Sequence, residues 1–340
     1  MVVFRVDSNS MIGKSHMYRC LAIAKAMKLM GKEVLFVCRE DSDVSDIQKS
    51  FLEYRLVPSM RLGSDEAINI LKDIINEVHA GVCVVDSYDI DNGGLKRIRE
   101  VCKVVYVDDY CYEIMDVDCV INSNIFAEKL DYMSKYPANV ELLLGIDYAT
   151  FSMDYVVGNS KKDKSYINTV LVYTGELDRY ELAPGIVDTL LDCMDDNVRI
   201  KVLTNKNSVT KDRLFQMSNY SSQLIIEQDV QNFSKLLGQC DAAVFCAEPV
   251  CYDLLRFGIP SCVYVNDNNQ KMFYNSMVEK NLAVAGGNCV DSKNKFYYNL
   301  REGILKLADE ECRKSLIENI SKLNIGSGAE KVAKAILKYE

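Results

Sequence analysis

His16 is the residue whose type and position point most directly to chemistry. It is one of only two histidines among 340 residues, and a histidine can take up or release a proton near neutral pH. The apolar segment 2–6 predicts a buried strand, and the segment 16–30 predicts an amphipathic helix. Open α/β sheets bind ligands at the loops after their parallel strands, so His16 lies at a candidate site. The alternative is a hydrogen-bonded polar residue at a helix start.

Acidic residues stand at the ends of two further predicted strands. Asp86 ends one of them, and Asp108 and Asp109 lie at the end of the next. A carboxylate can orient an imidazole and stabilise its protonated form, so Asp86 is a candidate partner for His16. It could instead cap the turn that follows. Two adjacent acids point to different sides of the chain, so we expect turn or loop roles for Asp108 and Asp109.

The segment 4–21 resembles the opening signature of the UDP-sugar hydrolases of pseudaminic acid biosynthesis and of related spore-coat polysaccharide proteins. That signature reads R-x-D, a short loop, I-G-x-G-H, a basic residue and a leucine. The matching residues here are Arg5, Asp7, Ile12, Gly13, His16, Arg19 and Leu21, and Ser15 replaces the second glycine. The resemblance implies that His16 is a general base on water, supported by Asp7 and Asp86. It also implies that Arg5, Gly13 and Ser15 contact the substrate.

Three further segments of the first half resemble motifs of the same family. Asp86-Ser87-Tyr88 is similar to its D-x-Y motif, and the segment 122–124 is similar to its N-x-N motif. These matches imply that Tyr88 and Asn124 bind substrate. The segment 142–148 resembles an L-L-G-x-x-Y motif. The arginine that usually follows this motif is missing here, and with it a basic substrate contact.

The resemblance assigns the nucleotide to the second half of the chain. Gly175 matches the first glycine of a G-G-x-D loop, in which Glu176 replaces the second. Val230 corresponds to a position whose backbone meets the base. Asn269 and Gln270 match an N-Q pair near the sugar.

The segment 245–253 departs most from the family. In relatives, a run of small residues here opens a helix whose backbone N–H groups hold the diphosphate. This chain has Glu248, a carboxylate, and Pro249, which has no N–H, at that place. Asp253 matches the acid that would bind the ribose hydroxyls. Glu248 and Pro249 favour the start of a helix, but we expect them to weaken phosphate binding.

The order of predicted elements indicates two α/β domains with doubly wound parallel sheets. Strands are predicted over 2–6, 34–38, 82–86, 104–108, 118–122, 169–173, 198–204, 223–226, 242–246 and 261–265. Helices are predicted over 16–30, 66–78, 93–101, 181–194, 232–239, 250–257, 271–280 and 329–339. The polar stretch 156–166 predicts a linker between a Rossmann-like domain over 1–155 and a nucleotide-binding-like domain over 167–340. The last helix could pack back on the first domain. Such a chain resembles the two-domain GT-B fold, with a cleft between the domains.

Composition excludes several classes of protein. The net charge of −9 argues against a nucleic-acid-binding surface. No apolar run approaches the roughly 20 residues of a membrane span, and no secretory leader is apparent, so a cytoplasmic protein is expected. The 13 cysteines form no C-x-x-C pair and read as buried small side chains in a reducing compartment. No zinc ligand set is apparent, and neither a metal nor a cofactor is expected.

Three functions follow from these patterns. The first is a hydrolase that releases UDP and a free deoxyamino sugar for nonulosonic acid or surface polysaccharide synthesis. The second is a catalytically weakened relative that binds a ligand or a pathway enzyme, as Glu176, Glu248 and Pro249 suggest. The third is a glycosyltransferase, in which a sugar hydroxyl replaces water, because fold cannot separate the two reactions.

Overall fold

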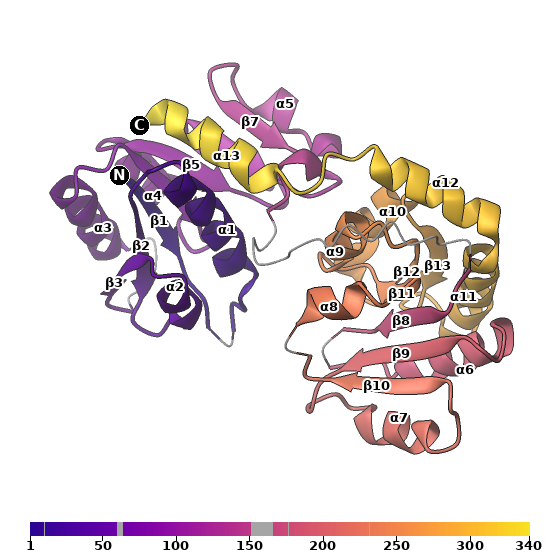
Figure 1. Ribbon diagram of the computed structural model, residues 1–340. Coiled ribbons are helices and arrows are strands. Elements are labelled where there is room, and N and C mark those ends of the chain that lie inside the picture. Colours follow the sequence, from indigo (N-terminus) through magenta and orange to yellow (C-terminus); the bar gives the residue numbers. More distant parts are fainter. Residues whose placement is uncertain (10, 60–63, 151–165, 176, 231) are drawn as a thin grey trace. The chain divides into compact units, whose positions relative to one another are not determined.

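The computed structural model describes residues 1–340 except 10, 60–63, 151–165, 176 and 231 (Figure 1). Its contacts divide the chain into two compact units. Unit 1 consists of Met1–Tyr155 and Ile325–Glu340, and unit 2 consists of Val156–Asn324. The sequence assigned residues 167–340 to the second domain and left open that the last helix packs back on the first, and residues 325–340 here belong to unit 1. The expected linker 156–166 lies outside the described residues except for its last residue.

Unit 1 contains a seven-stranded sheet in the order β3-β2-β1-β4-β5-β6-β7, in which every pair of neighbours is parallel. Its strands are β1 (Val2–Val6), β2 (Val34–Arg39), β3 (Glu53–Val57), β4 (Val82–Asp86), β5 (Lys103–Val107), β6 (Cys119–Asn122) and β7 (Glu141–Leu144). The strand order reverses direction between β1 and β4. The loops that follow these two strands therefore diverge at the carboxyl edge of the sheet, which is where ligands bind in such folds.

Helices cover both faces of this sheet. They are α1 (Ser15–Leu29), α2 (Ser45–Lys49), α3 (Asp65–Glu77), α4 (Asn92–Arg99), α5 (Tyr132–Lys135) and α13 (Gly328–Ile336), with short 3-10 turns η1 (Ala127–Lys129), η2 (Ile146–Tyr148) and η4 (Leu337–Tyr339). One core joins α1 and α13 to the sheet, and another joins α3 and α4 to its opposite face. Helices α1 and α13 lie side by side (Figure 1). A Cβ at Gly328 would clash with the carbonyl oxygen of Ala149, so glycine permits the close approach of α13 to the chain just after η2.

Unit 2 contains a six-stranded sheet in the order β10-β9-β8-β11-β12-β13, also parallel between neighbours. Its strands are β8 (Thr169–Tyr173), β9 (Arg199–Thr204), β10 (Leu224–Gln228), β11 (Ala242–Cys246), β12 (Ser261–Val265) and β13 (Val284–Asn288). Its helices are α6 (Ala183–Cys193), α7 (Lys211–Ser218), α8 (Phe233–Leu237), α9 (Cys251–Arg256), η3 (Asn268–Gln270), α10 (Lys271–Glu279), α11 (Lys293–Ala308) and α12 (Glu310–Ser321). The order reverses between β8 and β11, as it does between β1 and β4 in unit 1.

The predicted strands are confirmed to within about two residues at each end, and three strands were missed. Strand β3 is an edge strand whose side chains are half-buried or exposed, so it lacks a continuous apolar run. Strand β7 is an edge strand of 4 residues. Strand β13 contains Gly286 and Gly287, and glycine weakens the strand signal in a sequence.

Candidate functional site

The loop after β1 sets the position of His16. The side-chain oxygen of Asn9 accepts hydrogen bonds from the backbone amides of Met11 and Ile12, and the amide of Gly13 donates to the carbonyl of Asn9 at 2.8 Å. Gly13 has a φ of 81°, which a side chain would disfavour. This tight loop leads into α1, and His16 lies in its first turn as the sequence predicted.

His16 contacts the carboxylate at the end of β4. Its Nδ1 lies 2.6 Å from Oδ1 of Asp86, and its ring meets the ring of Tyr88 edge-on, with centroids 5.2 Å apart. Burial disfavours the charge on Asp86, but the guanidinium of Arg19 outweighs burial and lowers the pKa of this carboxyl. An ionised carboxylate only accepts hydrogen bonds, so the contact with Asp86 requires the proton on Nδ1. A terminal nitrogen of Arg19, which only donates, lies 3.0 Å from the same Nδ1 and would require the opposite tautomer. The shorter contact, with Asp86, favours the neutral ring that carries its proton on Nδ1 and has Nε2 as an acceptor. This is the tautomer that a general base needs.

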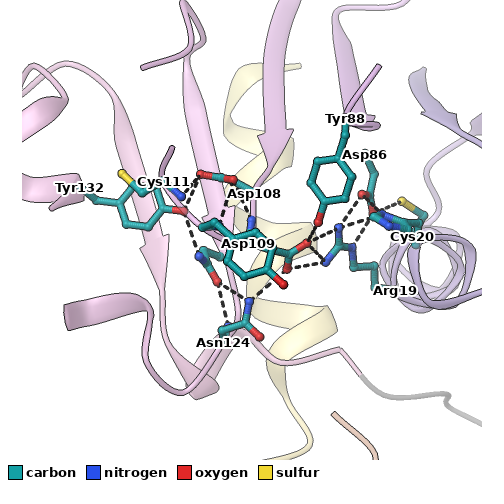
Figure 2. Close-up of polar contacts among 12 residues, drawn as sticks. Arg19, Cys20, Asp86, Tyr88, Asp108, Asp109, Cys111, Asn124 and Tyr132 are labelled. Carbon is teal, nitrogen blue, oxygen red and sulfur yellow. Dashed lines mark hydrogen bonds and ion pairs between the residues drawn. The ribbon is translucent and has the colours of Figure 1, made fainter. Parts of the chain in front are cut away.

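Arg19 joins two carboxylates at this edge (Figure 2). Its Nε and one terminal nitrogen donate to Asp86 at 2.5 and 2.6 Å. The other terminal nitrogen donates to Asp109 at 2.9 Å. Burial again opposes the charge, and Arg19 again outweighs it, holding the pKa of Asp109 at about 2. The pair of acids is therefore ionised around one shared cation.

Asp108 and Asp109 play different parts. The carboxylate of Asp108 accepts from the backbone amides of residues 109–111 and from the hydroxyl of Tyr132, so its expected turn role is confirmed. The prediction was wrong for Asp109, which reaches Arg19, Tyr88 and Asn124 instead. The sequence placed both acids at a strand end but gave no sign of the cation between Asp86 and Asp109. Only the neighbouring position of β4 and β5 in the sheet could have indicated it.

Arg5 and Asp7 must be corrected. Arg5 is 2% exposed and forms a two-pronged ion pair with Asp7, both N–O distances being 2.8 Å. Asp7 also accepts from the backbone amide of Arg39 at 2.8 Å and from the hydroxyl of Ser42 at 3.2 Å. Because the oxygens of Asp7 are engaged there, it does not hold the imidazole of His16. Because Arg5 is buried, it is not a substrate contact. Together they fasten the end of β1 to β2.

The other residues expected in this half lie at the same edge. Ser15 is exposed at the first position of α1. Tyr88 is 56% exposed, and its hydroxyl donates to Asp109. Asn124 is half-buried and donates to Asp109 at 3.0 Å. The structure thus groups His16, Tyr88 and Asn124 around Asp86 and Asp109.

Unit 2 has its own cavity at the carboxyl edge of its sheet. Its volume is about 420 Å³, within the range of small-molecule sites. It is lined by the ends of β8 and β9, including Tyr173 and Thr204, by Val230, and by Phe233 and Val250 at the starts of α8 and α9. Val230, expected to meet a base ring, therefore lines a cavity with an aromatic wall.

The remaining predicted residues of unit 2 lie on neighbouring loops. A Cβ at Gly175 would lie 3.5 Å from Oε1 of Glu248. The same oxygen accepts from the side chain of Gln270 at 3.3 Å. The side-chain oxygen of Gln270 also accepts from the backbone amides of Asn266 at 2.9 Å and of Asp267 at 3.4 Å, and the second bond closes a capping box around η3, where Asn269 lies. Glu248 thus faces Gly175 and Gln270, while Glu176 lies outside the described residues.

The start of α9 has few backbone donors to offer. The amides of Cys251, Tyr252 and Asp253 each bond to a carbonyl three residues earlier, at 2.9, 2.9 and 3.1 Å. The amide of Glu248 bonds to the carbonyl of Cys246, and Pro249 has no amide hydrogen. These four amides are therefore bonded to carbonyls of the chain itself, whereas the amide of Val250 has no such partner among the described residues. The expected harm to phosphate binding stays a prediction.

Asp253 is a half-buried acid in this helix. Burial raises its pKa to about 6, against the attraction of Arg256. Within the described part of the chain, no hydrogen bond to its carboxylate is found. The acid is therefore poised for a donor such as a hydroxyl group.

Neither a metal site nor a membrane span is found among the residues described. In that part of the chain, no three His, Cys, Asp or Glu side chains gather as a metal site would require. All 13 cysteines are free thiols, and nine of them are buried. No described helix is long and apolar enough to span a bilayer.

Comparison of the sequence with known proteins finds two distant relatives. No family model matches the chain. It is 24% identical over 273 residues to the UDP-2,4-diacetamido-2,4,6-trideoxy-beta-L-altropyranose hydrolase of Campylobacter jejuni, covering 78% of this chain and 92% of that protein. It is 22% identical to an uncharacterized protein of Methanocaldococcus jannaschii over 81% of this chain and 57% of that one.

Solved structures show the architecture. MurG of Acinetobacter baumannii superposes with a TM-score of 0.69 and 10% identity, over 99% of both chains. The glycosyltransferase VinC, solved in complex with dTDP, gives 0.67 and 12% over 99% of this chain and 98% of that one. The chain has the GT-B fold. At this level of identity the likeness speaks for the fold, and the chemistry must come from the residues.

Proposed function

We propose that this protein hydrolyses a nucleotide sugar, releasing UDP and a free sugar, with His16 as the general base. The observation that carries the proposal is the 2.6 Å contact between Nδ1 of His16 and the buried carboxylate of Asp86. It leaves Nε2 as a proton acceptor at the carboxyl edge of the unit 1 sheet. The similarity to the hydrolase of Campylobacter jejuni supports the same reaction.

The reaction balances with the groups present. Nε2 of His16 takes a proton from water as the water oxygen bonds to the anomeric carbon. The bond between that carbon and the diphosphate oxygen breaks, and its electron pair leaves with UDP. Asp86 stabilises the imidazolium that forms. A general base of this kind contributes about 10²–10⁴-fold.

Unit 2 is assigned to the nucleotide in this proposal. The cavity beside Val230 suits a base ring, and Asp253 suits ribose hydroxyls. Asn269 and Gln270 are assigned to the sugar. The free product would be a deoxyamino sugar for surface polysaccharide or nonulosonic acid synthesis, and pathway enzymes would be its partners.

The test measures UDP release from UDP-linked acetamido sugars, including the diacetamido sugar named for the Campylobacter enzyme. We expect His16→Gln to slow release about 10²–10⁴-fold with little change in melting temperature. The matched control is His79→Gln, because His79 is exposed and far along the chain. Equal rates in wild type and His16→Gln would reject the base.

The start of α9 favours a second candidate, a weakened relative that binds a ligand without turning it over. Its inward amides, Glu248 and Pro249 all oppose a diphosphate. This candidate predicts ligand binding without UDP release. Transfer to a sugar hydroxyl uses the same base, and turnover that requires an added acceptor would identify it.

A further inference from the structure

A chain of hydrogen bonds fixes the orientation of the Asn124 amide. Tyr132 donates to the carboxylate of Asp108 at 2.5 Å, so its oxygen accepts from the side-chain nitrogen of Asn122 at 2.9 Å. The oxygen of Asn122 is then an acceptor toward Asn124. Figure 2 shows this chain from Tyr132 to Asn124 and on to Asp109. The carboxylates at the two ends of this chain, those of Asp108 and Asp109, only accept hydrogen bonds. They therefore fix which atom donates and which accepts at every step between them.

The consequence falls on the free atom of Asn124. Its nitrogen donates to Asn122 at 2.9 Å and to Asp109 at 3.0 Å, which uses both amide hydrogens. Its Oδ1 is therefore an acceptor with no donor among the described residues. Asn124 is half-buried, so part of the residue is open to solvent.

Tyr88 and His16 each have a hydrogen-bond acceptor like that of Asn124. The hydroxyl of Tyr88 gives its hydrogen to Asp109, so Oη can only accept from a ligand. Nδ1 of His16 lies 2.6 Å from Asp86, which only accepts, and 3.0 Å from a nitrogen of Arg19, which only donates. The shorter contact favours a hydrogen on Nδ1, which leaves Nε2 as an acceptor. The rings of His16 and Tyr88 are 5.2 Å apart, and Tyr88 and Asn124 share the carboxylate of Asp109. The three side chains therefore lie close together at one edge of the unit 1 sheet.

We infer that Nε2 of His16, Oη of Tyr88 and Oδ1 of Asn124 form an acceptor surface that binds O–H and N–H groups of a neutral sugar and rejects a carboxylated one. The inference rests on the proposed function, because it names the class of sugar that the same site takes. Water, hydroxyls and acetamido N–H groups all supply the donors that this surface lacks. A carboxylate supplies none.

Charge acts in the same direction. Asp86 and Asp109 carry two negative charges against the single positive charge of Arg19. All three nitrogens of Arg19 donate to these acids, and one of them also lies 3.0 Å from Nδ1 of His16. A uronate would therefore meet three acceptors and a net negative charge. Sites built to pair with particular polar groups discriminate strongly when the groups do not match.

The first experiment needs no substrate. Nitrogen-15 NMR of histidine-labelled protein reports which ring nitrogen carries the proton, and His79→Gln assigns the two histidines. We expect His16 to be protonated at Nδ1 with Nε2 bare at pH 8, and Asp86→Asn to change that pattern. Protonation of neutral His16 at Nε2 would overturn the inference.

The second experiment tests the sugar. N-acetylglucosamine and glucuronate are titrated to tens of millimolar while the ring signals of His16 are followed. We expect N-acetylglucosamine to shift them at concentrations at least tenfold lower than glucuronate does. In Tyr88→Phe and Asn124→Ala the difference should fall to threefold or less, and Tyr112→Phe, an exposed tyrosine outside these hydrogen bonds, should keep it.

Equal shifts with both sugars, or none with either, would overturn the acceptor surface. A parallel assay of UDP release separates this from the proposed function. Discrimination at His16 without UDP release removes the hydrolase and keeps the surface. UDP release without discrimination does the reverse.

Discussion

Replacing Arg19 by methionine should expose how much the shared cation contributes to stability. The side chain of Asp86 is 1% exposed and that of Asp109 is 18% exposed. Methionine keeps most of the length of arginine but leaves two buried carboxylates facing each other. Breaking a buried pair from one side costs about 3–5 kcal/mol. In a unit of this size that is a fall of roughly 6–20 °C in melting temperature.

The matched control is Arg55→Met. Arg55 also makes a two-pronged pair, with Glu77 at 2.7 and 2.8 Å, but the two side chains are 38% and 63% exposed. Exposed pairs contribute about 0–1 kcal/mol. Arg19→Lys keeps the charge but cannot span both acids, so it should fall between the two. Calorimetry of the four proteins at neutral pH gives the ranking.

The effect of Arg19 on stability should depend on pH through the ionisation of Asp109. In the wild type, Arg19 keeps the pKa of Asp109 at about 2, below its unfolded value. This stabilising contribution is present above about pH 4 and is lost as the pH falls toward 2. Without Arg19, burial is opposed only by the hydrogen bonds from Tyr88 and Asn124, so we expect the folded pKa to rise above the unfolded one and the variant to lose stability as the pH rises from about 4. The gap between wild type and Arg19→Met should therefore be smallest near pH 2 and widen toward pH 7. An equal loss in Arg19→Met and Arg55→Met, or a gap that does not change with pH, would refute this account.

Three further outcomes are expected. UDP should give little thermal shift in the wild type, and Glu248→Ser combined with Pro249→Ser should produce one of a few degrees; a strong shift in the wild type would contradict our account of the α9 loop. Asp253→Asn should stabilise the protein at pH 7 by on the order of 1–3 kcal/mol, because a folded pKa of about 6 makes the ionised acid unfavourable above it; the gain should vanish near pH 4 in the same denaturation series. Asp7→Ala should cost about 3–5 kcal/mol in urea unfolding, yet the folded variant should release UDP at nearly the wild-type rate at low temperature; a selective loss of rate would restore Asp7 to the site.

The sequence predicts the strands and helices that carry the site, but it does not predict most of the hydrogen bonds and ion pairs within the site. A buried strand ending in Asp86 and a helix starting near His16 follow from apolar periodicity alone. Their contact follows from the pairing of β1 with β4, which a strand order could have suggested. The role of Asp109 does not follow, because a strand-end acid can turn inward to its own backbone, as Asp108 does, or outward to a neighbour. Arg19 decides between these outcomes, and it lies 90 residues away in the chain.

The predictions for Arg5 and Asp7 failed for a different reason. They match a motif, and a motif does not distinguish a residue that touches substrate from one that holds the loop in place. Burial makes the distinction, since a charge at 2% exposure must be paired inside the protein. Arg5 lies in β1 and Asp7 directly follows this strand, so the pair fixes the start of the loop that carries Gly13 and His16. Arg5 and Asp7 thus act on the site through the backbone.

The two units differ in how their sequence serves a ligand. In unit 1 the chain directs its donors inward, onto Asp86 and Asp109, and leaves acceptors at the surface. In unit 2, backbone N–H groups at the start of α9 are also bonded within the chain. These N–H groups are therefore not available to bind an anion. An acceptor surface suits a neutral sugar, whereas a diphosphate requires donors from elsewhere. Activity therefore depends on whether unit 2 holds UDP by its base and ribose, through the cavity at Val230 and through Asp253, without strong contacts to phosphate.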